Sequence, residues 1–241
     1  TVENLNIAYQ GVPAVMDVNF TLERGKVLTI VGESGSGKTT VIRALMGLLP
    51  VGGEVTEGTM IFNGQDLRTL SKSQWRSIRG KDMAMIFQDS GSALDPIVRI
   101  GKQFRELYES HIEIDNDECD RRAIELLESV SLPNGADILR RYPHELSGGQ
   151  RQRVGIAMAL AMDPALLIGD EPTSALDVTT QSQVVMQMLE LSREHNSAIV
   201  MVTHNLGVAA YMSDYIIVMK KGRVVDAGTT QDILENPSNE Y

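Results

Sequence analysis

The sequence predicts an α/β fold with a largely parallel β-sheet and a separate helical subdomain. From residue 165 onward, short apolar runs alternate with helix-length segments in the order that βαβ crossover units require. A glycine-rich turn near residue 32 joins a strand-like run to a helical stretch, and residues 71–162 are mainly helical in pattern. The 241 residues, 42% of them hydrophobic and 22% charged, suit one large packed domain or a core with a subdomain.

The elements are predicted in order from apolar runs and the breakers between them. Strands are expected at Val2–Ala8, Val18–Leu22, Val27–Val31, Thr59–Phe62, Ala165–Ile168, Ala198–Thr203 and Tyr215–Met219. A short apolar run at Met83–Phe87 interrupts the mainly helical pattern of residues 71–162. Helices are expected at Lys38–Leu48, Thr179–Glu194 and Leu206–Met212, besides those within 71–162. The expected division is a core with a β-subdomain, at about 1–87 and 163–241, and a helical subdomain at 88–162.

Charge and cysteine content restrict the class of protein. The formal net charge of −10 disfavours a nucleic-acid binder, which needs a basic surface, although Arg140, Arg141, Arg151 and Arg153 form one local basic cluster. A single cysteine, Cys119, excludes an intrachain disulfide and a cysteine-based metal site, as expected in a reducing compartment. The apolar runs are far shorter than the ~20 residues that span a bilayer, and no leader pattern precedes the first strand. We therefore expect a cytosolic protein.

The segment from Gly32 to Thr39 matches the phosphate-binding loop pattern G-x-x-x-x-G-K-[ST], in its usual setting between a strand and a helix. Its glycines let successive backbone N–H groups face one anion, aided by the positive end of the following helix. The pattern places the Lys38 charge on the β- and γ-phosphates and the Thr39 hydroxyl on Mg²⁺. A chance glycine turn is the alternative. The residues expected to bind nucleotide here are Gly32, Ser34, Gly35, Ser36, Gly37, Lys38, Thr39 and Thr40.

An apolar strand that ends in two adjacent acids, Asp170 and Glu171, supplies a second half for such a site. An acid at the carboxyl end of a buried strand near a phosphate-binding loop can complete the Mg²⁺ shell, and Asp170 is expected there. Glu171, just past the strand, is expected to orient the attacking water as a general base. The alternative is two solvated acids at a strand end.

The residues from Leu146 to Gln150 read Leu-Ser-Gly-Gly-Gln and precede a helical stretch. Ser147 and the amides of Gly148 and Gly149 would form a second anion-binding surface at a helix start, with a simple helix N-cap as the alternative. The sequence resembles the signature of ATP-binding cassette (ABC) ATPases. This resemblance, which covers essentially the whole chain, implies a P-loop NTPase fold with a RecA-like core, an antiparallel β-subdomain and a helical subdomain. It also implies that Ser147, Gly148, Gly149 and Gln150 contact ATP.

The resemblance assigns roles to further residues. Tyr9 is similar to the aromatic residue that stacks on adenine, and Gln88 to the glutamine that senses Mg²⁺ and couples to the helical subdomain. The loop Ser174-Ala-Leu-Asp177 resembles the one that partners exchange, and His204 resembles the histidine that contacts the γ-phosphate. Taken alone, Tyr9 suits a half-buried strand aromatic and His204 a turn histidine. The resemblance thus implies Glu171, His204 and Gln88 as catalytic residues, Asp177 as a nucleotide-site residue, and Thr39, Gln88 and Asp170 as Mg²⁺ ligands.

Other motifs are similar to those of the oligopeptide, dipeptide and nickel importers: Met85-Ile-Phe-Gln-Asp89, Leu94-Asp-Pro96, Arg141 to Gln150 and Asn236 to Tyr241. This implies an ATP-hydrolysing subunit on the cytoplasmic face of a membrane importer for peptides or chelated nickel. The implied partners are permease subunits, a second ABC ATPase subunit packed head-to-tail, and indirectly an extracytoplasmic binding protein, with no nucleic acid. The implied cofactors are ATP and Mg²⁺. The alternatives are a soluble cassette protein of DNA repair or translation, and a regulatory module that does not hydrolyse ATP.

Overall fold

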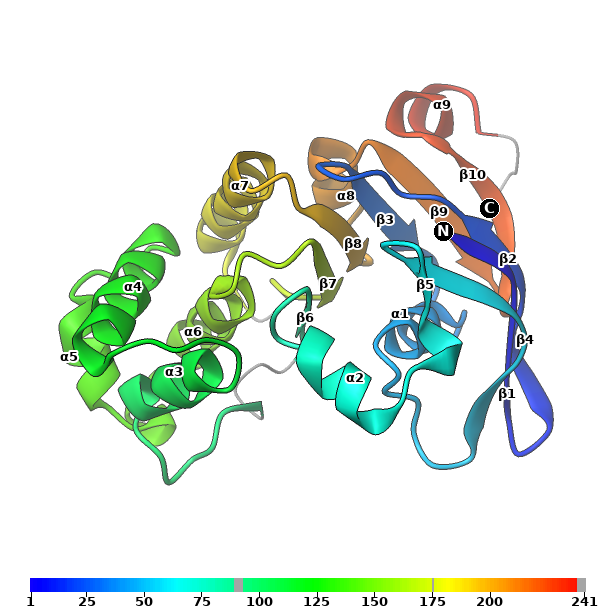
Figure 1. The fold of residues 1–241 in the computed structure, drawn as a ribbon. Coiled ribbons are helices and arrows are strands. Elements are labelled where there is room, and N and C mark those ends of the chain that lie inside the picture. Colours follow the sequence, from blue (N-terminus) through cyan, green and yellow to red (C-terminus); the bar gives the residue numbers. More distant parts are fainter. Residues whose placement is uncertain (89–92, 175, 238–241) are drawn as a thin grey trace. The chain divides into compact units, whose positions relative to one another are not determined.

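The computed structural model describes residues 1–88, 93–174 and 176–237 (Figure 1). Asp89, Ala175 and the last residues of the motif at 236–241, which belong to motifs singled out above, lie outside the described residues. The chain divides into two compact units. Unit 1 comprises Thr1–Arg76 and Ala198–Tyr241, and unit 2 comprises Ser77–Ser197.

Unit 1 contains an antiparallel sheet in the order β2-β1-β4-β5. These strands are β1 (Val2–Tyr9), β2 (Val12–Phe20), β4 (Gly53–Phe62) and β5 (Gln65–Asp66). The edge strand β2 begins at Val12, six residues before the predicted start at Val18. Pro13 argued against a strand here, because proline usually interrupts a sheet. It is tolerated in β2 because β2 is an edge strand.

The parallel strands of unit 1 hold its core. Strand β3 (Val27–Val31) pairs in parallel with β8 (Ala198–Val202) and with β9 (Tyr215–Lys220), and β10 (Arg223–Thr229) runs antiparallel to β9. All five residues of β3 and of β8 are buried. Unbroken apolar runs are typical of parallel strands that are covered on both faces. The helices α1 (Lys38–Leu45), α8 (Leu206–Met212) and α9 (Thr230–Glu235) complete this unit.

Unit 2 combines one parallel strand pair with a group of helices. Strand β6 (Met83–Ile86) pairs with β7 (Leu166–Asp170), with Ile86 opposite Gly169. Helix α2 (Lys72–Ile78), most of which belongs to unit 1, precedes β6, and α7 (Val178–Glu194) follows β7. Helix α4 (Asn116–Ser129) contacts α3 (Ile100–Glu109), α5 (Gly135–Arg140) and α6 (Gly148–Leu160), as Figure 1 shows. Together the two units confirm the predicted α/β class.

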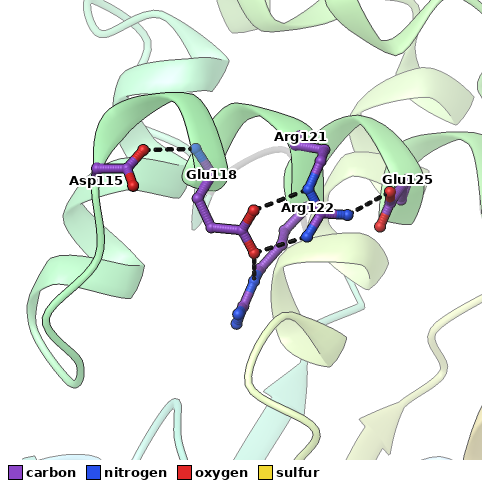
Figure 2. A network of polar contacts seen from close by, with 5 residues as sticks. All are labelled: Asp115, Glu118, Arg121, Arg122 and Glu125. Atoms are coloured by element: carbon purple, nitrogen blue, oxygen red, sulfur yellow. Dashed lines mark hydrogen bonds and ion pairs between the residues drawn. The ribbon is translucent and has the colours of Figure 1, made fainter.

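A carboxylate near the start of α4 is shared by two arginines (Figure 2). Glu118 accepts hydrogen bonds from Arg121 at 2.7 and 2.8 Å and from Arg122 at 2.7 Å. Arg121 also binds Glu125, and Asp115 caps the helix by accepting from the Glu118 backbone N–H. The hydrogen bonds from the two arginines lower the pKa of Glu118 to about 2. This carboxylate is therefore charged over the whole ordinary pH range.

Candidate functional site

The loop between β3 and α1 has a backbone that only glycine can form at its first position. Gly32 has φ +143°, and a Cβ there would lie 2.1 Å from the backbone oxygen of Met219. Gly35 and Gly37 also have positive φ, +79° and +102°. Together these glycines bend the chain into a concave loop that leads into α1, with the first helical N–H groups at its end. The loop therefore has the glycine conformations that its sequence pattern predicts, and its binding of phosphate stays a prediction.

Lys38, the first residue of α1, is folded back over this loop. Its Nζ donates to the carbonyl oxygens of Gly32 and Glu33, both at 2.7 Å, and lies 3.4 Å from Ser36 Oγ. The residue is only 7% exposed. The carbonyl oxygens hold the Lys38 ammonium group at the loop, where an anionic phosphate can meet it. Thr39 and Thr40 follow on α1 and are half-buried.

His204 follows a strand next to the one that leads into this loop. Strands β3 and β8 are parallel, with Ile30 opposite Val202, so the loop after β3 and the turn after β8 leave the same edge of the sheet. His204 is exposed, and Asn205 caps α8 by accepting from the backbone N–H groups of Gly207 and Val208. The predicted contact of His204 with a γ-phosphate stays a prediction.

Tyr9 ends strand β1 and is half-buried. It pairs with Gly53 of β4, and a Cβ on Gly53 would lie 2.6 Å from Tyr9 Cε1. One side of the ring therefore packs against the Gly53 backbone. This packing agrees with a half-buried strand aromatic, and stacking of the ring on adenine stays a prediction.

In unit 2, Gln88 and Glu171 meet at the ends of two paired strands. Asp170 is the last residue of β7 and only 5% exposed, whereas Glu171 is half-buried with φ +48°. Gln88 Nε2 lies 3.4 Å from Glu171 Oε2. A non-glycine residue with positive φ is uncommon and often found at functional sites. The two residues, 83 positions apart in the chain, thus form one polar pair.

The segment Leu146–Gln150 is a capped helix start with accessible glycines. Ser147 Oγ accepts from the Gln150 backbone N–H at 3.2 Å, and Gln150 Oε1 accepts from the Ser147 N–H at 2.9 Å. Gly148 and Ser147 are exposed, and Gly149 is half-buried. The 13-residue helix α6 begins there. The structure thus shows the helix cap, and that cap leaves the amide surface of the two glycines reachable.

Asp177 caps helix α7. Its carboxylate accepts from the Thr180 backbone N–H at 3.0 Å and from the Thr180 hydroxyl at 2.7 Å. These hydrogen bonds lower the pKa of Asp177. The cap accounts for an acid at this position within the chain, and a further role at a nucleotide site stays a prediction.

Comparison with known proteins decides the family. The sequence pattern of the family described as ABC transporter matches residues 15–174, about two thirds of the chain. This chain belongs to the ABC transporter family. The dipeptide transport ATP-binding protein DppD of Lactococcus lactis subsp. cremoris is 45% identical over all of this chain and 70% of its own length. The oligopeptide transport ATP-binding protein OppD of Haemophilus influenzae is 46% identical over all of this chain and 75% of its own length.

Solved structures agree with this assignment. A dimeric post-hydrolysis state of the ATP-binding cassette MJ0796, bound to ADP and Pi, has a TM-score of 0.84 at 28% identity and covers 95% of this chain and 97% of its own. The cbiO1 structure from Clostridium perfringens, part of the cbiONQ transporter complex, has a TM-score of 0.81 at 27% identity, over 98% and 90% of the two chains. The chain has the ABC ATPase fold and is an ABC transporter ATPase that hydrolyses ATP for transport.

One residue of this ABC ATPase that sequence reasoning missed is Gln152 of α6. The residue is 2% exposed, and its Nε2 donates to the backbone oxygen of Pro172 and to that of Phe87 at 3.5 Å. The available signal was its position, because Gln152 lies four residues before Ile156 and eight before Leu160, on the buried face of the helix. A glutamine among core positions needs a hydrogen-bonding partner.

Arginines of the predicted basic cluster stabilise local structure in this ABC ATPase. Arg141 forms an ion pair with Asp137. Arg151 donates to the backbone oxygen of Leu146 at 2.5 Å, and Arg153 donates to those of Ser131 and Gly149. Burial lowers the pKa of Arg153. Two of these side chains therefore hold carbonyls of the Leu146–Gln150 segment.

Across the described residues, no helix combines the length and the apolar character needed to cross a bilayer.

Proposed function

We propose that this ATPase powers the import of short peptides through a membrane transporter. Relatives named for dipeptide and oligopeptide transport, 45% and 46% identical over the whole chain, support this cargo class. A relative named for glutathione import, GsiA of Shigella boydii, is 43% identical over the whole chain, which spans 40% of that longer protein. Chelated nickel, the other cargo that the resemblance implied, has no such support here.

ATP hydrolysis is assigned to the following residues. Lys38 and the loop from Gly32 to Thr39 bind the β- and γ-phosphates, with Tyr9 against the adenine and His204 at the γ-phosphate. Glu171 accepts a proton from the attacking water. The water oxygen bonds to the γ-phosphorus, and the bond from that phosphorus to ADP breaks. The observation that carries this step is the contact between Gln88 and Glu171, which restricts the carboxylate of the residue that directly follows the buried Asp170.

Magnesium fits the donors that this chain offers. The Thr39 hydroxyl and the buried Asp170 carboxylate are oxygen ligands of the kind that Mg²⁺ takes beside nucleotide phosphates, and Gln88 supplies a side-chain amide oxygen. When bound, the ion neutralises charge that develops on the phosphate oxygens. Asp170 contributes its carboxylate at the end of a rigid strand.

A second cassette, either another copy of this chain or a homologous subunit, would complete the site. The exposed residues Ser147 and Gly148, through the serine hydroxyl and the glycine backbone N–H, together with the N–H of Gly149 at the start of α6, suit the γ-phosphate of a nucleotide on that second subunit. Asp177, at the start of α7, would lie on the loop exchanged between the two subunits. The solved dimeric cassette MJ0796, 28% identical to this chain, supports a dimer as the working form.

Membrane-embedded permease subunits would contact the segment from Gln88 to Arg99, of which residues 89–92 lie outside the described part. Ile97 is 81% exposed there. Gln103 of α3 holds the segment, because its buried amide binds the Asp95 backbone N–H and O at 3.0 Å and the Val98 O at 2.8 Å. The ATPase would then act at the cytoplasmic face, and an extracytoplasmic binding protein would deliver peptide to the permease.

The Ile97→Cys variant should crosslink to a permease subunit. Crosslinks only from cysteines placed in Thr229 to Glu235 would contradict this placement.

The proposed hydrolytic role is tested by Glu171→Gln, which keeps size and removes the basic carboxylate. We expect ATP hydrolysis to fall roughly 10²–10⁴-fold while ATP still binds. Unhydrolysed ATP should accumulate a closed dimer, detectable by native mass spectrometry with the partner subunits present. Adding Ser147→Arg should disperse that dimer, because it places bulk and charge where the phosphate binds.

Glu190→Gln, on the exposed face of α7, is the matched control and should hydrolyse ATP at the normal rate. Undiminished hydrolysis in Glu171→Gln, or equal dimer content with and without ATP, would remove the role proposed for Glu171. Equal phosphate release with and without the permease subunits and peptide would favour a soluble cassette protein. An intact chain with no phosphate release under any condition would favour a regulatory module.

A further inference from the structure

We propose that Gln152 is a positioning residue for ATP hydrolysis. Its side-chain amide fixes the backbone beside both Gln88 and Glu171 and ties that backbone to α6. This inference rests on the role proposed for Glu171 and adds a buried residue that acts through the backbone of its neighbours.

The contacts of Gln152 reach both strand ends at once. Its amide nitrogen carries two hydrogens and donates to the carbonyl oxygens of Phe87 and Pro172. Phe87 immediately precedes Gln88, and Pro172 immediately follows Glu171. One buried side chain therefore hydrogen-bonds to the residue next to each member of the polar pair, to Phe87 before Gln88 and to Pro172 after Glu171.

The backbone at these places needs a hydrogen-bonding partner from outside the strands. The pairing of β6 with β7 extends to Ile86 opposite Gly169, so residues 87 and 172 lie beyond the ladder. Pro172 is buried, so its carbonyl must be paired outside the sheet, because an unpaired buried carbonyl is costly. The Gln152 amide supplies that pairing where the ladder stops.

The turn that carries Glu171 is strained and held from two sides. Glu171 has φ +48°, and its carbonyl accepts from the Ser174 backbone N–H at 3.2 Å and from the Ser174 hydroxyl at 3.0 Å. The next carbonyl, that of Pro172, accepts from Gln152. A sparsely populated backbone conformation persists only where its surroundings enforce it. Loss of the Gln152 bond should let the Glu171 carboxylate shift from the position that activates water, and a shift of about 1 Å can cost up to 100-fold in rate.

The position of Gln152 also links this turn to the helix start at Ser147. Both residues lie on the same capped helix, five positions apart, and Arg151 and Arg153 hold the carbonyls of Leu146 and Gly149 from the same helix. The helix that presents Ser147 is thus hydrogen-bonded directly to the turn that presents Glu171.

The test is Gln152→Met, which keeps side-chain length and removes both donors. Measured in the complete transporter, kcat should fall at least tenfold while KM for ATP changes less than twofold. Gln187→Met is the matched control, because Gln187 of α7 makes an amide hydrogen bond to Ser131 Oγ at 2.9 Å and none of its bonds reaches residue 87 or 172. It should leave kcat and KM within twofold of the wild type.

A double substitution separates positioning from general damage. In the Glu171→Gln background, adding Gln152→Met should lower single-turnover hydrolysis less than twofold, because the carboxylate it positions is already gone. If Gln152→Met fails to fold, Gln152→Asn keeps the amide on a shorter side chain and should lower kcat in the same direction. Unchanged kcat in a folded variant, a raised KM with normal kcat, or a full additional loss in the double variant would overturn the proposal. Normal ATP hydrolysis by the Glu171→Gln single variant would instead overturn the role of Glu171 itself.

Discussion

The side-chain nitrogen of Gln88 lies 3.4 Å from the carboxylate of Glu171, at the ends of the parallel strands β6 and β7. Glu171 leaves its strand in a left-handed conformation, whereas Gln88 comes from an exposed position just past the other strand. An amide donor at this distance restricts where the oxygens of the Glu171 carboxylate can lie. The orientation of the Glu171 carboxylate therefore depends on the position of Gln88, in the backbone that follows β6.

Replacing Gln88 by alanine should slow hydrolysis more than it weakens ATP binding, because the phosphate loop and Lys38 remain. A hydrogen bond to a charged group contributes about 1.5–3 kcal/mol, so loss of its part in orienting Glu171 should lower kcat about tenfold or more. Steady-state phosphate release and equilibrium nucleotide binding measure the two effects. Gln183→Ala, at an exposed position of α7, is the control and should change neither. A wild-type kcat in Gln88→Ala would show that the contact has no part in turnover.

Lys38→Ala should abolish productive ATP binding. The substitution removes a charge that lies among the carbonyls of Gly32 and Glu33, where the β- and γ-phosphates are proposed to bind. Nucleotide affinity measured by calorimetry is the readout, and circular dichroism verifies the fold. Lys72→Ala, on the surface of α2, should keep normal affinity. Near-normal affinity in a folded Lys38→Ala protein would show that the loop does not hold phosphate through this lysine.

Gly32→Ala should destabilise the fold more than an alanine at another left-handed glycine. At Gly11, φ is +80° and a Cβ would meet nothing within 4 Å, so Gly11→Ala should cost about 1 kcal/mol from backbone strain alone. At Gly32 the Cβ would lie 2.1 Å from Met219 O, so the strands must separate, at an added cost of about 1–3 kcal/mol. Urea unfolding measures both free energies. Equal losses would contradict the close approach of Gly32 to β9.

Glu118 should contribute to the stability of α4 in a pH-dependent way. Its two arginine partners lower its pKa from 4.5 to about 2, so the folded protein binds its proton less readily than the unfolded chain. This contribution is complete above pH 4.5 and is lost as the pH falls from 4.5 toward 2. Glu118→Gln should therefore lower the free energy of unfolding at pH 7, and its difference from the wild type should shrink at pH 3. Glu128→Gln, an exposed position on the same helix, should show no such convergence.

Much of the fold could be predicted because its buried strands are unbroken apolar runs. Strand β3 has the predicted bounds, and β8 differs from prediction by one residue. Strand β10 was not predicted, because Asp226 and Gly228 are poor strand residues and pairing with β9 stabilises them. Helix α1 ends at Leu45, three residues earlier than predicted, where Gly47 adopts φ +59°.

The residues of the candidate site differ in how far the sequence could predict them. The phosphate loop follows from local backbone geometry, so a short pattern was sufficient to find it. The role of Gln152 depends on carbonyls 65 and 20 positions away, which a local pattern does not contain. Asp177 is the opposite case. Its role as a helix cap is local, but the sequence analysis assigned it only the nucleotide-site role that the family implies.

The carbonyl oxygens around Lys38 reduce the entropy that its side chain loses when a ligand binds. A lysine side chain normally samples many rotamers, and fixing it on binding costs about 0.5–1.5 kcal/mol. Here the oxygens of Gly32 and Glu33 already restrict those rotamers in the folded chain. The entropy is lost during folding rather than on encounter with the ligand. The loop is thus preorganised, and more of the electrostatic attraction is retained as affinity.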